Sequence, residues 1–577
     1  MINIFLTVIM AVICLISFVL YFRNEANKAE KVAKKPTSKN KKKEQKENPK
    51  EIETEEKCFF IKHYKVLIIA VLLIGVLVRS AFYWEFPRGL NQDEASVCYD
   101  TYADVKYGFD RNGDHNPVYS VAWGSGHSSL YITLSKPFMA LFGLNMFTAR
   151  IVNVLFSCIA LFAFYGILKR LLSKKGALLG TFIFAICPWH IMMARWALEC
   201  NLFPNVFIIA TFFLVRGFTN QKFYIPSLFI YGLCLYAYGT SYMIVPSYLL
   251  VMAIYLLIHK KISWKMLVLC MGVFIVTAIP IMLFMAVNMF GAPEMDFGFM
   301  SVPKLINGRY NTTVTVLGGN FLAEVGKNLK TFFSIIFTQN DRLIYNVIPA
   351  YGTIYQFSVP FMLSGVIIYF MDMWKGRKKF NPAFVVVAMT VSMFILGMLS
   401  QLNVNRANFI FIPLTLFTIY GIIFVIKNIK FMAEPTVGLY IIAFCMFVIY
   451  YFSPKYQVDQ VGWSFSYGFG EAVQYASENA EDDVYMTTKV HAPYIKALFF
   501  TKTEPQVFLD TVDYEDPNRQ VRQVRSFDRY YTGVPEVLPE GDNAYIFSNG
   551  EYRNRTDFNK EDYETKVFGH YTVMTKK

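Results

Sequence analysis

Two adjacent carboxylates, Asp93 and Glu94, directly follow the end of an apolar stretch of this sequence. They lie in the segment 89–95, GLNQDEA, and a stretch compatible with a helix follows over 96–105. An ionised aspartate at a membrane surface can take a proton from an attacking hydroxyl or amine, and it can face positive charge that develops on an anomeric carbon. We therefore interpret Asp93 as a general base and Glu94 as its supporting carboxylate. The alternative is that Asp93 only caps the helix that follows.

Arginines at the same ends of other apolar stretches form a second group with chemical potential. A phosphate on a lipid carrier sits at headgroup level, and its negative charge grows when its sugar leaves, so basic partners are needed there. We select three arginines for this role, with the first preferred: Arg406, Arg195 and Arg150. Two alternatives stay open. Arg406 can be an ordinary arginine at the end of a span, and Arg195 can form a local ion pair with Glu199, four residues on.

The composition places these residues in a membrane protein. The chain is 55% hydrophobic and only 17% charged, and its apolar residues gather in stretches of roughly 17 to 25 residues, the length that crosses a bilayer as a helix. We predict about twelve spans, one of them an N-terminal anchor. They fall near 2–22, 64–83, 148–168, 176–193, 202–218, 225–241, 243–258, 266–290, 356–374, 383–400, 407–426 and 434–452.

The basic residues between the spans predict which side each segment faces. The formal charge of +14 suggests nucleic acid at first, but clusters such as Lys375, Arg377, Lys378 and Lys379 fall on one side under this count. Membrane orientation explains the charge more simply than a nucleic-acid partner. The same alternation places 84–147, 291–355 and everything after 452 on the external face, so function is expected there. The basic, Lys-rich composition and the lack of cysteines in the polar C-terminal region fit a bacterial plasma membrane.

The two ends of the chain differ from the middle. We interpret 1–22 as a retained anchor, 23–62 as a disordered basic cytoplasmic linker and 63–452 as the membrane domain. The polar region 453–577 reads as an extracytoplasmic α/β domain, with a helix over 471–478 and strands over 483–487 and 544–548.

The first external segment resembles that of the GT-C glycosyltransferases, in particular bacterial relatives of protein O-mannosyltransferases and of lipid A aminoarabinose transferases. The resemblance rests on the Asp93-Glu94 pair, on the segment 109–117, FDRNGDHNP, and on 188–204, which begins PWH and contains RWALECN. It implies a GT-C membrane fold of about eleven core spans plus the anchor, with Asp93 as the catalytic base. The family often has His-Pro-Pro where this chain has His115-Asn116-Pro117.

The resemblance also extends the set of candidate site residues. The segment 340–349, NDRLIYNVIP, looks like a loop that lines the donor cavity in related enzymes, and 403–408 looks like an Asn/Arg turn near the donor phosphate. The residues proposed to bind substrate are Tyr99, His115, Glu199, Tyr345, Asn346 and Asn403.

The expected activity is transfer of a monosaccharide, hexose or pentose, from a polyprenyl-phosphate carrier to an extracytoplasmic acceptor, with inversion. A transporter or flippase of a polyprenyl-linked saccharide is the alternative, and a membrane scaffold is a third class. A transporter would place ionisable groups near the bilayer midplane, whereas the carboxylates here gather outside the spans. Asp110 and Asp114 could join Asp93 around a divalent cation, but relatives with this pattern are regarded as metal-independent, so we predict no essential metal or other cofactor.

Overall fold

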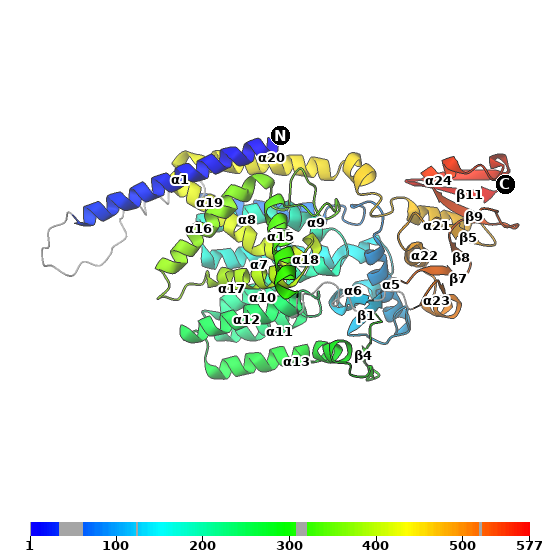
Figure 1. Cartoon of the computed structure of the whole chain (residues 1–577), viewed down its shortest axis with the longest axis horizontal. Coiled ribbons are helices and arrows are strands. Elements are labelled where there is room, and N and C mark those ends of the chain that lie inside the picture. Colours follow the sequence, from blue (N-terminus) through cyan, green and yellow to red (C-terminus); the bar gives the residue numbers. More distant parts are fainter. Residues whose placement is uncertain (1, 34–61, 123–124, 307–319, 518–521) are drawn as a thin grey trace.

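The computed structural model describes residues 2–33, 62–122, 125–306, 320–517 and 522–577. A helical bundle makes up most of the molecule, its helices running along the long axis, and a smaller domain containing the C-terminus lies at one end (Figure 1). We call that end of the bundle the domain end.

Thirteen helices make up the bundle within the described residues. They are α1 (Ile2–Ala33), α4 (Tyr64–Ser80), α7 (Met146–Leu171), α8 (Lys174–Ala185), α9 (Pro188–Ala194), α10 (Glu199–Gly217), α11 (Tyr224–Cys234), α12 (Ser241–Ile258), α13 (Trp264–Met289), α16 (Val359–Lys375), α17 (Phe384–Leu399), α19 (Phe411–Asn428) and α20 (Ala433–Tyr451).

Fewer of these helices are long enough to span a membrane than the sequence predicts. Eight are long and apolar enough to cross a membrane in the described part, or nine if α8 and α9, bent by 53° at a break, form one span. Three helices are shorter than the spans expected for them. These are α4, α11 and α17, where spans were expected over 64–83, 225–241 and 383–400. The count of about twelve spans therefore stays a prediction. The span predicted near 176–193 is thus broken at Ile186 and Cys187, directly before Pro188.

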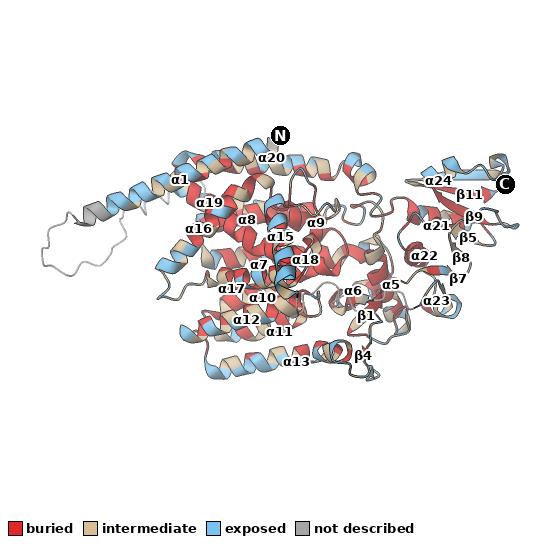
Figure 2. Cartoon of the chain, in the orientation of Figure 1, coloured by how far each residue is buried: buried red, intermediate tan, exposed pale blue. Residues whose placement is uncertain are grey.

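Helix burial separates the centre of the bundle from its rim. In the most apolar 18-residue stretch of α10, 78% of the residues are buried, whereas in that of α13 only 22% are buried. Figure 2 shows that exposed and half-buried residues predominate along α13 and α1. Apolar side chains on α13 such as Val268 and Val276 are exposed, as expected for a helix that faces lipid tails. At the centre, α16 and α19 approach closely through Gly365 and Gly421: a Cβ on either would lie 1.8 Å from a backbone oxygen of the other helix.

The N-terminal helix is longer than predicted and belongs to the bundle. The anchor was expected to end at residue 22, but α1 continues to Ala33; the rest of the predicted linker, 34–61, lies outside the described residues. The α1 helix packs against α16 and α19, for example through Phe18 and Phe424 with ring centroids 4.8 Å apart. Asn3 bonds to the carbonyl of Ala350 at 2.5 Å, so this end of α1 lies beside the second predicted external segment.

Short elements cover the domain end. The first predicted external segment contains α5 (Gln92–Tyr107), β1 (Tyr119–Ala122), β2 (Ser125–Ser128) and α6 (Ser129–Phe142). The second contains β3 (Met295–Asp296), β4 (Ser301–Val302) and α15 (Phe321–Thr338), and a short helix, α18 (Val404–Ala407), precedes α19. α15 packs against α17 through Phe332 and Phe394, whose ring centroids lie 5.4 Å apart.

The C-terminal domain is a mixed α/β unit, as predicted. Its seven-stranded sheet has the order β10-β11-β9-β5-β8-β7-β6, and β5 pairs in parallel with both β8 and β9. The predicted helix and strands are confirmed as α21 (Phe469–Glu478), β5 (Val484–Met486) and β9 (Ala544–Ser548). The remaining elements are α22 (Pro493–Thr501), α23 (Pro505–Thr511), β6 (Asp513–Tyr514), β7 (Val524–Phe527), β8 (Tyr530–Thr532), α24 (Asn549–Asn554), β10 (Tyr563–Phe568) and β11 (Tyr571–Lys576).

Direct backbone contacts join this domain to the start of α5. Leu90 donates its N–H to the carbonyl of Phe465 at 2.6 Å, and Asn91 donates its side-chain amide to the carbonyl of Ser464 at 3.0 Å. Gly89 has φ +87°, and a Cβ there would lie 2.3 Å from the Phe465 oxygen, so the approach requires glycine. Because α22 also packs on α5, the C-terminal domain positions the helix that carries Asp93.

Candidate active site

Asp93 is the second residue of α5, and a neighbour caps that helix. The side chain of Asn91 accepts the N–H of Asp93 at 2.9 Å, and Glu94 completes a capping box by accepting the N–H of Asn91 at 3.1 Å. Asn91, and not Asp93, is therefore the N-cap of α5. The carboxylate of Asp93 is half-buried, and polar groups from other segments lie near it.

Lys496, on α22 of the C-terminal domain, is one of those groups. Its side chain is buried, and its ammonium donates to Ser466 Oγ at 2.9 Å and to the carbonyl of His491 at 3.0 Å. Burial lowers the pKa of Lys496 to about 7, and the nearby negative charges of Asp93 and Glu94 oppose that shift. Sequence reasoning missed this residue, although a lone lysine inside the apolar segment 494–500, YIKALFF, was a usable signal.

Tyr345, in the second predicted external segment, lies near enough to Asp93 to be affected by its charge. Burial raises the pKa of Tyr345 to about 12, with further contributions from the charges of Asp341 and Asp93. Its ring lies edge-on to that of Trp196, with centroids 5.8 Å apart. The Trp196 ring in turn packs against the ring of Phe465, with centroids 5.5 Å apart. Segments far apart in the sequence thus meet around Asp93.

Asp341 links this cluster to the turn that carries Arg406. Its Oδ2 accepts from Asn346 Nδ2 at 2.8 Å and from the N–H of Val404 at 2.9 Å. Asn403 caps α18 by accepting the N–H of Arg406 at 2.9 Å. Asn346 and Asn403 therefore shape the site through the backbone and Asp341.

Arg406 keeps donors available at this turn. One guanidinium nitrogen donates to the carbonyl of Gln401 at 3.0 Å, and the side chain is half-buried. Within the described ranges, no carboxylate lies within ion-pair distance of Arg406. Its positive charge is therefore not neutralised by a neighbouring side chain, which suits a partner for phosphate.

Arg150 and Glu94 have a structural role that the sequence prediction did not foresee. Both are fully buried, and Arg150 binds both carboxylate oxygens of Glu94 at 2.9 Å. The other Arg150 donors bond to the carbonyls of Tyr83, Pro87 and Gly89, so all five N–H groups have acceptors. This geometry leaves Arg150 no donor for a phosphate, and it leaves Glu94 no oxygen for a substrate because its Oε1 also accepts the N–H of Ala197.

Arg195 and Glu199 do not form the ion pair that their spacing suggested. Arg195 is buried and donates to the carbonyls of Val78, Arg79 and Ala81 at 2.7 to 3.2 Å. Glu199 accepts the N–H of Ser128, and its Oε2 lies 3.8 Å from Nδ1 of His127. α9 ends at Ala194 and α10 begins at Glu199, so the two residues do not share the continuous helix that i, i+4 contact needs. Neither role predicted for them, phosphate binding by Arg195 or substrate binding by Glu199, has geometric support.

Tyr99 and His115 also lie away from the cluster around Asp93. The Tyr99 ring is buried, and its hydroxyl donates to the carbonyl of Thr503 at 2.7 Å, which ties α5 to the C-terminal domain. His115 is exposed beyond the other end of α5, where its Nδ1 lies 2.8 Å from the carbonyl oxygen of Gly108. Neither residue is placed to bind a substrate beside Asp93.

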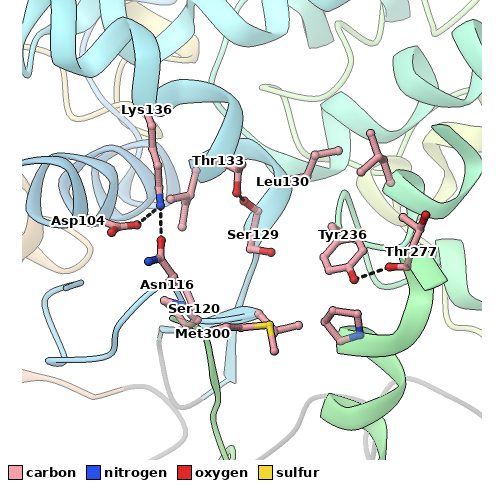
Figure 3. Close-up of a pocket in the computed structure, with 15 residues that line it drawn as sticks. Asp104, Asn116, Ser120, Ser129, Leu130, Thr133, Lys136, Tyr236, Thr277 and Met300 are labelled. Atoms are coloured by element: carbon pink, nitrogen blue, oxygen red, sulfur yellow. Dashed lines mark hydrogen bonds and ion pairs between the residues drawn. The ribbon is translucent and has the colours of Figure 1, made fainter. Parts of the chain in front are cut away.

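A cavity of about 300 Å³ opens near the far end of α5 (Figure 3). Lys136 points into it and pairs with Asp104 at 2.5 Å and with the side-chain oxygen of Asn116 at 2.6 Å. Hydroxyls of Ser120, Ser129 and Thr133 also line it. Asp104 lies 11 residues after Asp93 on the helix, a rise of about 16 Å, so the two sites are distinct.

The described residues contain no group of three or more His, Cys, Asp or Glu side chains that could hold a metal ion. Asp110 instead accepts the N–H groups of Asn112 at 2.8 Å and Asp114 at 3.1 Å within its own turn. Asp110 and Asp114 therefore do not converge on Asp93, and the absence of an essential metal stays a prediction.

Comparisons with known proteins fit this architecture. A family model described as dolichyl-phosphate-mannose-protein mannosyltransferase matches residues 128–284. Two crystal structures of ArnT from Cupriavidus metallidurans match with TM-scores of 0.51, at 11% identity for the apo state and 12% for the state bound to undecaprenyl phosphate. Each alignment covers 89% of this chain and 98% of ArnT. The chain has a GT-C fold. No curated protein has a significant sequence match to it.

The GT-C fold confirms the resemblance on which the sequence interpretation relied, and the chain is a multi-pass membrane protein. The family model begins at Ser128, just before α6, so it covers neither Asp93 nor the C-terminal domain. The roles of Asp93, Lys496 and Arg406 therefore depend on the geometry of this chain.

Proposed function

We propose that this GT-C protein transfers a monosaccharide from a polyprenyl-phosphate carrier to an acceptor at the domain end. The observation that carries the proposal is the half-buried Asp93 at the start of α5, whose charge acts on Lys496 and Tyr345 from two distant segments. The undecaprenyl phosphate bound to ArnT supports a carrier of this class. The sugar is a hexose or a pentose, and the acceptor is a glycan, lipid or protein outside the cytoplasm of a bacterial cell.

In this mechanism Asp93 takes the proton of the acceptor hydroxyl or amine as the nucleophile bonds to the anomeric carbon. The bond between that carbon and the phosphate oxygen breaks on the opposite face, so the configuration inverts. The carrier phosphate leaves with one more negative charge, which Arg406 is placed to bind. In its protonated form Lys496 supplies a second cation near Asp93. No step requires ATP or a nicotinamide cofactor.

Purified protein in lipid nanodiscs, incubated with radiolabelled polyprenyl-phosphate sugars and cell-envelope acceptors, tests the proposal. We expect transfer by the parent and a loss of at least about a thousandfold in Asp93→Asn, the order expected when a general base is removed. Asp459→Asn is the matched control, because Asp459 is an exposed carboxylate at the same end of the bundle.

Two outcomes would overturn this assignment. Transfer by Asp93→Asn at the rate of the parent would remove the proposed base. Movement of the labelled lipid across vesicle membranes without any transfer would identify a flippase instead.

A further inference from the structure

A cavity of about 620 Å³ lies in the C-terminal domain, and its lining residues include neither Asp93 nor any residue that lines the cavity of Figure 3. Three loops line it, and each follows one of the parallel strands. Thr488 and Lys489 follow β5, Gly533 and Val534 follow β8, and α24 with Arg555 follows β9.

The strand directions explain why these loops meet. β5 pairs in parallel with β8 on one side and with β9 on the other, so the carboxyl ends of all three strands lie at one edge of the sheet. Between β5 and β8 the chain passes through α22, α23, β6 and β7, and after β8 it returns to β9 on the other side of β5. Crevices outside the carboxyl ends of parallel strands, where the strand order reverses, are the usual ligand sites of open α/β sheets.

Trp463 gives the cavity an aromatic wall. It comes from the segment that joins α20 to the C-terminal domain, and half of its side chain, 50%, is exposed. Its ring stacks on His570 with centroids 4.2 Å apart and planes within 6°. A tryptophan held flat in this way, with so much of its ring in solvent, is a platform for the C–H face of a sugar ring.

Polar side chains around the ring remain available for hydroxyl groups. Thr488, Lys489 and Asn554 are exposed, and none of them makes a side-chain hydrogen bond to another described residue. Glu551 and Arg555, by contrast, are engaged within the domain: Glu551 accepts the N–H of Ser548 at 2.8 Å, and Arg555 pairs with Asp557. The cavity thus combines one apolar face with hydroxyl, ammonium and amide groups, the pattern that a polyhydroxylated ligand requires.

We propose that this crevice binds a saccharide, with one sugar ring against Trp463 and its hydroxyls bonded to Thr488, Lys489 and Asn554. The inference goes beyond the proposed transfer reaction and does not depend on it. The two sites are nonetheless connected, because the next residues after Trp463 are Ser464 and Phe465, which bond to Asn91 and Leu90 at the start of α5. A glycan held in the crevice would therefore rest on the segment that positions Asp93.

Binding to the full-length protein in nanodiscs tests this inference. The probes are methyl glycosides of common hexoses, chito-oligosaccharides of two to four units, and inorganic phosphate, each measured by saturation-transfer NMR and by titration calorimetry. We expect at least one saccharide to bind, with affinity reduced at least tenfold in Trp463→Ala and largely retained in Trp463→Phe. Trp374→Ala is the matched control, because Trp374 is also exposed, at 69%, but lies at the end of α16.

Several outcomes would overturn the inference. These are no saccharide bound at millimolar concentration, equal binding by the parent and Trp463→Ala, or binding of phosphate alone, which would indicate a simple anion site. Trp463→Phe guards against misfolding, because it keeps the aromatic contact with His570. Asp93→Asn should bind the saccharide as the parent does, so a failure of the transfer proposal stays distinguishable from a failure of this one.

Discussion

At the scale of single residues, Asp93 and Glu94 are neighbours with different environments. Glu94 is buried and bonded through both oxygens to Arg150, Asn91 and Ala197, whereas Asp93 is half-buried. We expect Glu94→Gln to lower the free energy of unfolding by about 3–5 kcal/mol, because it leaves the Arg150 charge buried without its partner. Asp93→Asn should unfold within about 2 °C of the parent while losing transfer. Thermal unfolding in detergent checks both, and equal destabilisation of the two variants would contradict the assignment.

Lys496 gives a prediction in which stability depends on pH. Its pKa is 10.5 in the unfolded chain and falls to about 7 on burial. Between these values the unfolded chain holds a proton that the folded chain lacks, so this lysine destabilises the fold most below pH 7 and progressively less as the pH rises. We therefore expect Lys496→Met to raise the unfolding temperature more at pH 6 than at pH 10.

The same variant separates function from stability. Loss of transfer by a Lys496→Met protein that is more stable than the parent would assign Lys496 to the reaction, since residues kept at a cost in stability are typical of functional sites. Lys502→Met, in a residue just beyond α22 and exposed, is the control. Full transfer activity in Lys496→Met would remove Lys496 from the proposed mechanism.

At the scale of elements, the contact between α16 and α19 depends on two glycines. A Cβ on Gly365 would lie 1.8 Å from the carbonyl oxygen of Phe417, a backbone atom that cannot rotate away. We expect Gly365→Ala to push the helices apart and to lower the unfolding temperature by several degrees, or to abolish expression. Gly438→Ala on α20 is the matched control, because nothing lies within 4 Å of the added Cβ. Equal unfolding temperatures for the two variants would show that the helices adjust without cost.

At the scale of the whole molecule, the two ends of the bundle differ: one carries basic residues, and the other carries the C-terminal domain. The connection from α16 to α17, which contains Lys375 and Arg377, lies at the end opposite the C-terminal domain (Figure 1), and Lys375 donates to the hydroxyl of Tyr21 at 2.8 Å. By the positive-inside rule we expect that end to face the cytoplasm. We therefore expect a cysteine at Glu540, in the C-terminal domain, to react with an impermeant maleimide on intact cells. A cysteine at Arg377 should react only after permeabilisation, with the parent chain as the blank, and the reverse pattern would contradict this orientation.

The sequence by itself determined the features that depend on local pattern. Apolar stretches gave the membrane class, and the alternation of side chains gave β5 and β9 within one or two residues. A helix beginning near Asp93 was also predicted, from the stretch 96–105, although its N-cap is Asn91 and not Asp93.

Only the tertiary structure decided which charged groups remain available for chemistry. Arg150 and Arg195 have the same residue type and the same predicted location as Arg406, but buried carbonyls and Glu94 satisfy most or all of their donors. Lys496 lies near Asp93 only because the C-terminal domain docks on α5. Such pairings depend on packing between segments hundreds of residues apart, and neither spacing nor hydropathy along the chain encodes that packing.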